Sequence, residues 1–466
     1  MSVVYRQKGF LEYMKKFDRD KYLKRLKFKR AWRRYERYFY IGVPCLMIII
    51  LGIYFTYSKF SSSKEEEVVR TTVGEFIHGD VVIGAYIDGE YSKTIPGKND
   101  GYVVKNVVCD NGTVGTWDND KWGLLTTNMT KRSKCNVYFE IKKTLVNVVT
   151  KASSDTSMFA ADDKDSNIRY IGAAPSNYLY FNCSDYNNQT DSTCEKWRII
   201  GVFNNIIKSD GTKENLVKII RDEGIGKYSW DNKNTSTGAE TAYGKNDWTT
   251  ARLNYLLNPG HDSESIGGSL YYNAKSGTCY YGKNNATTSC DFTSTGLKND
   301  TTRNAIEEIV WNIGGVSSSY FGETSSMFYE SERGTTVYTG RPTTWTGKIG
   351  LMYPSDYGYA TAGGPTTNRT SCLENNLSRW SNSSYSDCKE NDYLYKPSYN
   401  QWTLTPYAGF ADTSFRVDPT GHVMGNGFVY YDSGYSMSVY PTLYLKSNIL
   451  VKSGNGTSTS PYKLEM

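Results

Sequence analysis

An uncharged apolar run at residues 38–58, YFYIGVPCLMIIILGIYFTYS, constrains this chain more than any other feature of its sequence. At about 1.5 Å of rise per residue, a helix of that length crosses a hydrocarbon core of roughly 30 Å. Tyr38, Tyr40, Tyr54 and Tyr57 lie near its two ends, where interfacial aromatic side chains are common. A buried core helix would not require the positive charge that precedes the run. The pattern therefore predicts a single transmembrane helix.

The charge distribution predicts the orientation of that helix. Residues 1–37 hold fourteen Lys or Arg against four acidic residues, although the whole chain has a net charge of only +6. Positive flanking charge keeps a segment in the cytoplasm. We therefore expect a single-pass cell-membrane protein with a cytoplasmic basic arm, 1–37, and a large extracellular C-terminal part. No small-residue cleavage site follows the apolar run, which argues against a cleaved signal peptide.

The basic arm has two interpretations. Basic residues beside a membrane segment commonly contact anionic lipid, at about 1 kcal/mol per residue. The alternative is a cytoplasmic partner or nucleic acid. Because the basic residues are concentrated before one apolar segment, we favour the lipid contact and predict no nucleic-acid partner.

Eight cysteines outside the apolar run indicate an oxidising compartment. They fall into four local pairs, and segments such as SDYNNQTDST and YYGKNNATTS between partners are polar and turn-forming. Eight cysteines allow 105 pairings, but small surface loops favour the local ones, each stabilising the fold by about 3 kcal/mol. Zinc would need closer spacing or neighbouring histidines, and neither occurs. The predicted disulfides are Cys109–Cys135, Cys183–Cys194, Cys279–Cys290 and Cys372–Cys388.

The chain after the apolar run divides into two parts. Forty Tyr and forty-two Gly favour strands and turn-rich loops. A polar stalk, 59–68, precedes a small all-β module, 69–142, and a larger domain, 143–466. Groups of strands separated by two amphipathic helices predict the α+β fold class for this larger domain. We expect its strands at 177–183, 195–203 and 215–223 and its helices at 247–260 and 299–315.

Several segments carry a family resemblance. MFAADDKDSNIRYIGAAPSNYLYF, followed by EKWRIIGVF, LVKIIRDE, QWTLTP and YPTLYLKSNI, resembles a pattern in membrane-anchored surface proteins of Gram-positive and related bacteria. The resemblance covers residues 145–466 and implies a C-type lectin-like domain, closest to the formylglycine-generating-enzyme variant. Relatives usually have Arg-Pro where this chain has Tyr440-Pro441. Some such proteins resemble targets of diversity-generating retroelements, in which mutation of Asn codons randomises an exposed loop face.

The stretch 407–435, YAGFADTSFRVDPTGHVMGNGFVYYDSGY, mixes aromatics, glycines and small polar residues between two expected strands. The resemblance implies that this stretch forms the exposed loop face. Rigid aromatics would supply contact area at small entropic cost, and small polar residues would supply adaptable hydrogen bonds, as in antibody paratopes. The predicted ligand-binding residues are Tyr407, Gly409, Phe410, Asp412, Thr413, Phe415, Asp418, His422, Phe428, Tyr430, Asp432 and Tyr435.

An alternative reading treats the same stretch as ordinary loop and core residues. Local alternation is compatible with a core position for Phe415, Val417, Val423 and Val429. Met424 and Met437 cannot arise from Asn codons, so they would be fixed positions or would argue against diversification.

Catalytic and metal-binding patterns are absent from the sequence. His78, His261 and His422 do not lie at metal-ligand spacing, and the catalytic sets of the resembling enzymes cannot be mapped onto this chain. The acids between 162 and 165 could form an acid/base pair or a cation site, but clustered loop acids are usually solvated. We therefore predict no enzyme activity, no metal and no cofactor.

The sequence thus predicts a surface protein that binds an extracellular protein or glycan as a receptor or adhesin. Two alternatives stay open. One is a structural envelope protein whose loops contact only neighbouring copies. The other is an unrecognised enzyme of the formylglycine-generating-enzyme-like fold.

Overall fold

The computed structural model describes residues 23–28, 30, 81–98, 100–232, 243–282, 285–317, 322–430 and 437–466. Residues 23–28 and 30 of the basic arm are helical. The predicted membrane segment, 38–58, and the stalk, 59–68, lie outside the described residues. Within the described residues, no helix is long and apolar enough to cross a membrane. The chain divides into two compact units, Met1–Ile141 and Lys142–Met466.

The described part of the first unit is made of strands. Four of them form a sheet in the order β2-β1-β6-β3, in which β1 and β6 are parallel, and β4 and β5 form a separate hairpin. Trp117 packs edge-on against Phe139, with 5.3 Å between ring centroids. The strands are β1 Val81–Ile87, β2 Glu90–Ser92, β3 Tyr102–Cys109, β4 Val114–Asp118, β5 Gly123–Thr127 and β6 Ser133–Ile141.

A seven-stranded sheet forms the centre of the larger unit, in the order β16-β21-β11-β10-β8-β7, with β9 also paired to β10. Residues 197–203 of β10 are all buried, so both faces of this strand are covered. The strands predicted at 177–183, 195–203 and 215–223 are β9, β10 and β11. The strand bounds are β7 Phe159–Ala160, β8 Ile168–Tyr170, β9 Tyr178–Phe181, β10 Glu195–Ile207, β11 Lys213–Arg221, β16 Ile349–Gly350 and β21 Thr442–Leu445.

A second sheet has the strand order β19-β18-β17-β20. Its strands are β17 Asn400–Pro406, β18 Thr413–Val417, β19 Val423–Phe428 and β20 Met437–Ser438. Three two-stranded sheets complete the strands of the larger unit, namely β12 Ser276–Tyr280 with β13 Thr287–Asp291, β14 Ile309–Asn312 with β15 Thr344–Gly347, and β22 Leu450–Ser453 with β23 Lys463–Glu465.

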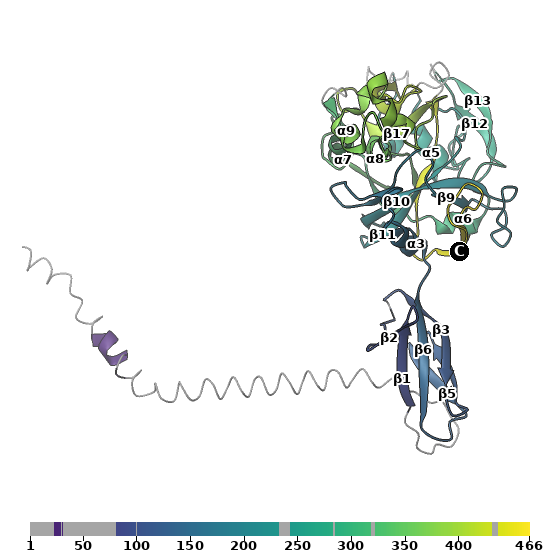
Figure 1. Ribbon diagram of the computed structural model, residues 1–466. Coiled ribbons are helices and arrows are strands. Elements are labelled where there is room, and N and C mark those ends of the chain that lie inside the picture. The colour runs from purple at the N-terminus through teal and green to yellow at the C-terminus, as the bar shows by residue number, and fades with distance from the viewer. Residues whose placement is uncertain are drawn as a thin grey trace, which may run out of the picture. The chain divides into compact units, whose positions relative to one another are not determined.

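Short helices surround these sheets, and none of those described in the larger unit exceeds eight residues. Figure 1 shows α3 and the C-terminus at one end of this unit, and α7, α8, α9 and β17 toward the other. The α-helices are α3 Leu145–Ala152, α5 Arg252–Leu257, α6 Asp300–Ala305, α7 Ser325–Glu332, α8 Pro354–Tyr359, α9 Arg369–Glu374 and α10 Ser386–Glu390. The 3-10 turns are η1 Trp248–Thr250, η3 Leu377–Arg379 and η4 Ser383–Tyr385.

The predicted α+β class is wrong. Strand accounts for 36% of the structure and helix for 17%. The fold prediction of an α+β, C-type lectin-like larger domain is therefore corrected to a mainly β-sheet protein with short helices. The physical reason is that the apolar residues belong mainly to strands, such as β10, that are buried on both faces. The helices are only one or two turns long.

The two predicted helices show where the error arose. The first, 247–260, is a 3-10 turn followed by the six-residue α5, although the predicted Asp247 cap is present and accepts from the amide of Thr249 at 3.0 Å. The second, 299–315, is helical only as far as Ala305. Beyond it, Ile309 and Trp311 are buried and alternate with half-buried neighbours, because this segment is the strand β14.

The four predicted disulfides are all present. Cys109 and Cys135 face each other on β3 and β6 of the first unit. In the larger unit, Cys183–Cys194, Cys279–Cys290 and Cys372–Cys388 close loops with sequence separations of 11, 11 and 16 residues. Each loop is short and local, so the pairing follows from sequence neighbourhood.

Candidate functional site

The stretch predicted as one loop face is largely a β-hairpin. β18 and β19 are antiparallel neighbours, with Thr413 opposite Phe428 and Val417 opposite Val423. The turn 418–422 closes one end of the hairpin, and the segments 407–412 and 428–430 meet at the other end. Because a five-residue strand rises about 3.3 Å per residue, the two ends of the hairpin lie about 13 Å apart.

Two predicted binding residues, Asp418 and His422, lie at the closed end. The Asp418 Oδ1 atom accepts hydrogen bonds from the backbone amides of Thr420 at 2.8 Å and His422 at 3.0 Å, as a turn-forming acid does. Tyr357 donates its hydroxyl proton to the backbone oxygen of Gly421. Burial lowers the pKa of His422. The structure therefore does not bring Asp418 and His422 together with the predicted aromatic residues 407 and 410.

Two further predicted residues lie inside the protein. Thr413 is 4% exposed and Phe415 is 0% exposed. The Phe415 ring packs edge-on against Phe328 at 5.1 Å. Val417, Val423 and Val429 are also 0% exposed. The core alternative is therefore right for Phe415 and its valine neighbours, and the binding role predicted for Thr413 and Phe415 is incompatible with their burial.

The open end of the hairpin gathers aromatic rings. Phe410 is 60% exposed, and its ring centroid lies 5.6 Å from that of Tyr407. Across the hairpin, Phe428 lies 5.8 Å from Tyr430, which in turn lies 6.1 Å from Tyr243. Tyr407 and Phe428 are half-buried, and Tyr430 is 9% exposed. We call Tyr243, Tyr407, Phe410, Phe428 and Tyr430 the aromatic rim.

The small polar candidates beside the rim differ in exposure. Gly409 is exposed, next to Phe410. Asp412 is half-buried, and burial raises the pKa of its carboxyl group. Its backbone oxygen accepts from the amide of Val429 at 2.9 Å, which joins the two halves of the rim. The remaining two predicted residues, Asp432 and Tyr435, lie outside the described residues.

A buried asparagine, which the sequence analysis missed, holds the turn of the rim. Asn246 is 1% exposed, and its Nδ2 atom lies within hydrogen-bond distance of the backbone oxygens of Tyr407 at 2.8 Å, Phe410 at 2.8 Å and Thr413 at 2.9 Å. The backbone amide of Asn246 donates to the backbone oxygen of Ala411. No periodic pattern marks Asn246, because its partners lie more than 160 residues away in sequence.

The acids at 162–165 were the candidate for an acid/base pair or a cation site. In the structure, each of them has a different partner. Asp162 pairs with Arg369 at 2.9 Å, and Asp165 accepts from the Tyr329 hydroxyl at 2.6 Å. Asp163 is buried and pairs with Arg169 at 2.9 Å. The expectation of solvated acids is therefore wrong for Asp163. Among the described residues, no group of three or more His, Cys, Asp or Glu could hold a metal ion.

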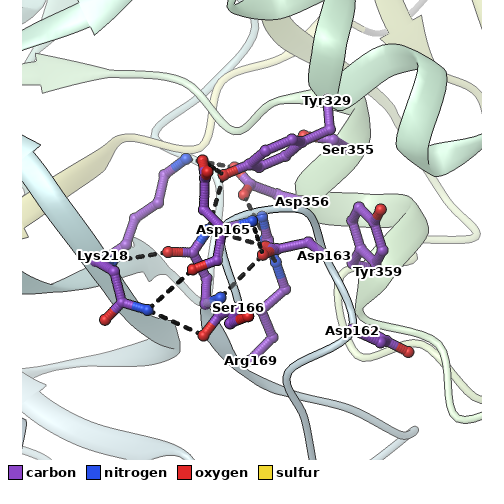
Figure 2. A network of polar contacts seen from close by, with 12 residues as sticks. Asp162, Asp163, Asp165, Ser166, Arg169, Lys218, Tyr329, Ser355, Asp356 and Tyr359 are labelled. Atoms are coloured by element: carbon purple, nitrogen blue, oxygen red, sulfur yellow. Dashed lines mark hydrogen bonds and ion pairs between the residues drawn. The ribbon is translucent and has the colours of Figure 1, made fainter.

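Asp163 belongs to a charge cluster, which we define as Asp163, Arg169, Lys218 and Asp356 (Figure 2). Asp356 accepts from Arg169 at 2.9 Å and also pairs with Lys218. The four side chains are at most 1% exposed. Burial lowers the pKa of Lys218 to about 8, against the opposing pull of Asp356. Two positive and two negative groups balance in charge, although the buried Nη2 atom of Arg169 makes no hydrogen bond within the described structure. The cluster is a structural link between β8, β11 and α8.

Beside the cluster, Glu332 is fully buried, and burial raises the pKa of its carboxyl group to about 7. The fold therefore favours protonated Glu332. Protonation of Glu332 therefore stabilises the folded state. This stabilisation is complete below the ordinary pKa of 4.5 and is lost as the pH rises through about 7.

Between pH 5 and pH 8, we expect the free energy of unfolding of the wild-type protein to fall by about 1–3 kcal/mol more than that of the Glu332→Gln variant. The reason is that glutamine cannot ionise. Urea unfolding of both proteins at the two pH values measures this difference. A stability difference that is the same at pH 5 and pH 8 would contradict the assignment.

No family model, curated protein or solved structure matches this chain.

Proposed function

We propose that this chain is a cell-surface ligand-binding protein of the receptor or adhesin type, and that the aromatic rim is its binding face. The observation that carries the proposal is the position of Phe410. This side chain is 60% exposed, yet the backbone oxygen of the same residue accepts a hydrogen bond from the buried Asn246. An exposed aromatic ring on a turn that a buried side chain fixes is pre-organised for contact with a ligand.

The physical chemistry of the rim suits recognition. Aromatic side chains dominate the energetics of many interfaces because they bury a large area and lose little conformational freedom. The 407–413 turn is held by Asn246 and by Arg341, whose Nη2 atom donates to the oxygen of Ala411 at 3.2 Å. A pre-organised turn avoids part of the entropic cost of binding. The mixture of Gly409, Asp412 and the rings allows both apolar and hydrogen-bonded contacts.

The cellular location is part of the same proposal. The apolar run 38–58 would anchor the chain, and the basic arm 1–37 would hold its N-terminus in the cytoplasm. The four disulfides are compatible with an extracellular position for both units. The resemblance to bacterial surface proteins adds the idea that rim positions vary among close copies of the gene, which sequencing of such copies would test.

The proposal predicts a strong effect of a single substitution. We expect Phe410→Ser to weaken binding at least thirtyfold, as loss of a central aromatic contact does, and to leave the melting temperature nearly unchanged because the ring is mostly exposed. The measurement is binding of the wild-type and variant chains to an array of glycans and cell-surface proteins.

Tyr399→Ser is the matched control. Tyr399 is 43% exposed and directly precedes β17, whereas the rim begins after the other end of that strand. Binding should survive this substitution. Equal loss in both variants would contradict a specific rim, and self-association of the chain without any array signal would favour the structural envelope alternative.

A further inference from the structure

A cavity of about 280 Å³ lies beside the charge cluster, away from the aromatic rim. β10, β14, α7 and β21 contribute to its walls. Its volume is just below the range of about 300–1,000 Å³ that is typical of sites for drug-sized ligands. The space therefore suits a molecule with a single ring. The wall includes the rings of Phe203, Trp311, Tyr329 and Tyr444 and the polar side chains of Asn312 and Arg333.

Polar groups on the cavity wall have unused hydrogen-bonding capacity. Tyr444 is 2% exposed and lines the cavity, and no hydrogen bond joins its hydroxyl to another described residue. Arg333 uses only Nη1, which donates to the oxygen of Tyr329 at 3.1 Å and to Glu332 at 3.2 Å. Within the described structure, its Nε and Nη2 atoms and the side-chain amide of Asn312 make no hydrogen bond. These groups face an accessible cavity, so they can form hydrogen bonds to a molecule that enters it.

Aromatic rings form the apolar part of the wall. Phe203, Trp311, Tyr353 and Tyr444 surround the Lys218 ammonium group, whose nitrogen lies 5.3, 5.6, 4.2 and 5.6 Å from their ring centroids. The Tyr329 ring is covered by the Arg333 guanidinium at 3.3 Å. These cation–π contacts hold the rings in place. The cavity wall therefore contains aromatic rings whose positions are fixed.

The charges around the cavity disfavour an ionic ligand. Lys218 is paired with Asp356, and Arg333 is paired with Glu332. Asp165, which also lines the cavity, adds a negative group to its wall. An anion would meet Asp165 on the cavity wall, and a cation would meet Arg333. A neutral ligand with both donors and acceptors meets no uncompensated charge.

We propose that this cavity binds one neutral sugar residue, with a ring face against the aromatic wall and its hydroxyls bonded to Tyr444, Arg333 and Asn312. A pyranose has an apolar face that stacks on aromatic rings and a rim of hydroxyl groups that donate and accept. This site is separate from the aromatic rim, and the inference does not rest on the proposed function.

Saturation-transfer NMR on the full-length chain tests the inference with glucose, galactose, mannose, N-acetylglucosamine and glucuronate. We expect transfer to at least one neutral sugar, with a Kd of about 1 mM as expected for a ligand of this size, and weaker transfer to glucuronate. Absence of transfer to every neutral sugar, or preferential binding of glucuronate, would overturn the assignment.

Two variants locate the binding. Tyr444→Phe removes one unpartnered hydroxyl and should weaken sugar binding about three- to tenfold without lowering the melting temperature. Thr344→Trp should abolish binding by filling the cavity from an exposed wall position. Thr346→Trp, an exposed position on the same strand that does not line the cavity, is the control. Unchanged binding in Thr344→Trp would overturn the site.

Discussion

Asp356→Ala is expected to destabilise the larger unit by about 3–5 kcal/mol, the cost of breaking a buried ion pair from one side. The substitution removes the shared partner of Arg169 and Lys218, which are 1% and 0% exposed. It also removes the acceptor for the amide of Tyr353 at the start of α8. Lys218 would then lose its ion-pair partner, whereas Arg169 would keep Asp163 at 2.9 Å. Because both cations are buried, water cannot replace the lost carboxylate. Urea unfolding followed by tryptophan fluorescence measures the loss.

Glu330→Ala is the matched control for this prediction. Glu330 also pairs with a lysine, Lys164, at 2.9 Å, but the two side chains are 60% and 69% exposed. Water solvates both partners once the pair is broken, so little change is expected. If Asp356→Ala unfolds at the same urea concentration as Glu330→Ala, the cluster is not a structural link.

Gly201→Ala is expected to cost about 3 kcal/mol, at the upper end of the range for overpacking. Gly201 lies in β10 opposite Arg169 of β8. A Cβ atom there would meet the backbone oxygen of Ile168 at 2.1 Å and the Cα of Arg169 at 3.0 Å. Backbone atoms cannot rotate away as a side chain can. β8 would have to shift, and Arg169 would shift with it.

The control for this substitution is Gly322→Ala, where an added Cβ meets no atom within 4 Å. It should unfold as wild-type protein does. Because Gly201→Ala and Asp356→Ala both act on Arg169, the double variant should lose less stability than the sum of the two single losses. Additive losses would show that β8 does not carry the strain to the cluster.

The candidate site was predictable only in part. The aromatic content of 407–435 marked Tyr407, Phe410, Phe428 and Tyr430, which the structure gathers at one end of the hairpin. The same composition also marked Asp418, which forms the turn at the other end. Residue type alone does not say at which end of a hairpin a residue lies, because that depends on the strand register.

The wrong prediction of a helix at 299–315 has a similar cause. Residues 306–313 contain apolar side chains whose spacing fits one face of a helix, but Ile309 and Trp311 also alternate as in a strand. Pairing of β14 with β15, whose residues lie more than thirty positions later, decides between them. A short apolar run cannot reveal a partner strand that is far away in sequence.

The sequence by itself determined the features that depend on near neighbours. These are the four disulfide pairs, the strands at 195–203 and 215–223, and the Asp247 cap. Only the tertiary structure decided which rim residues are exposed, how Asn246 holds them, and that Asp356 meets Arg169 and Lys218 across 187 and 138 residues of sequence. The physical reason is that burial of a polar group is tolerable only beside a specific partner, and long-range packing supplies that partner.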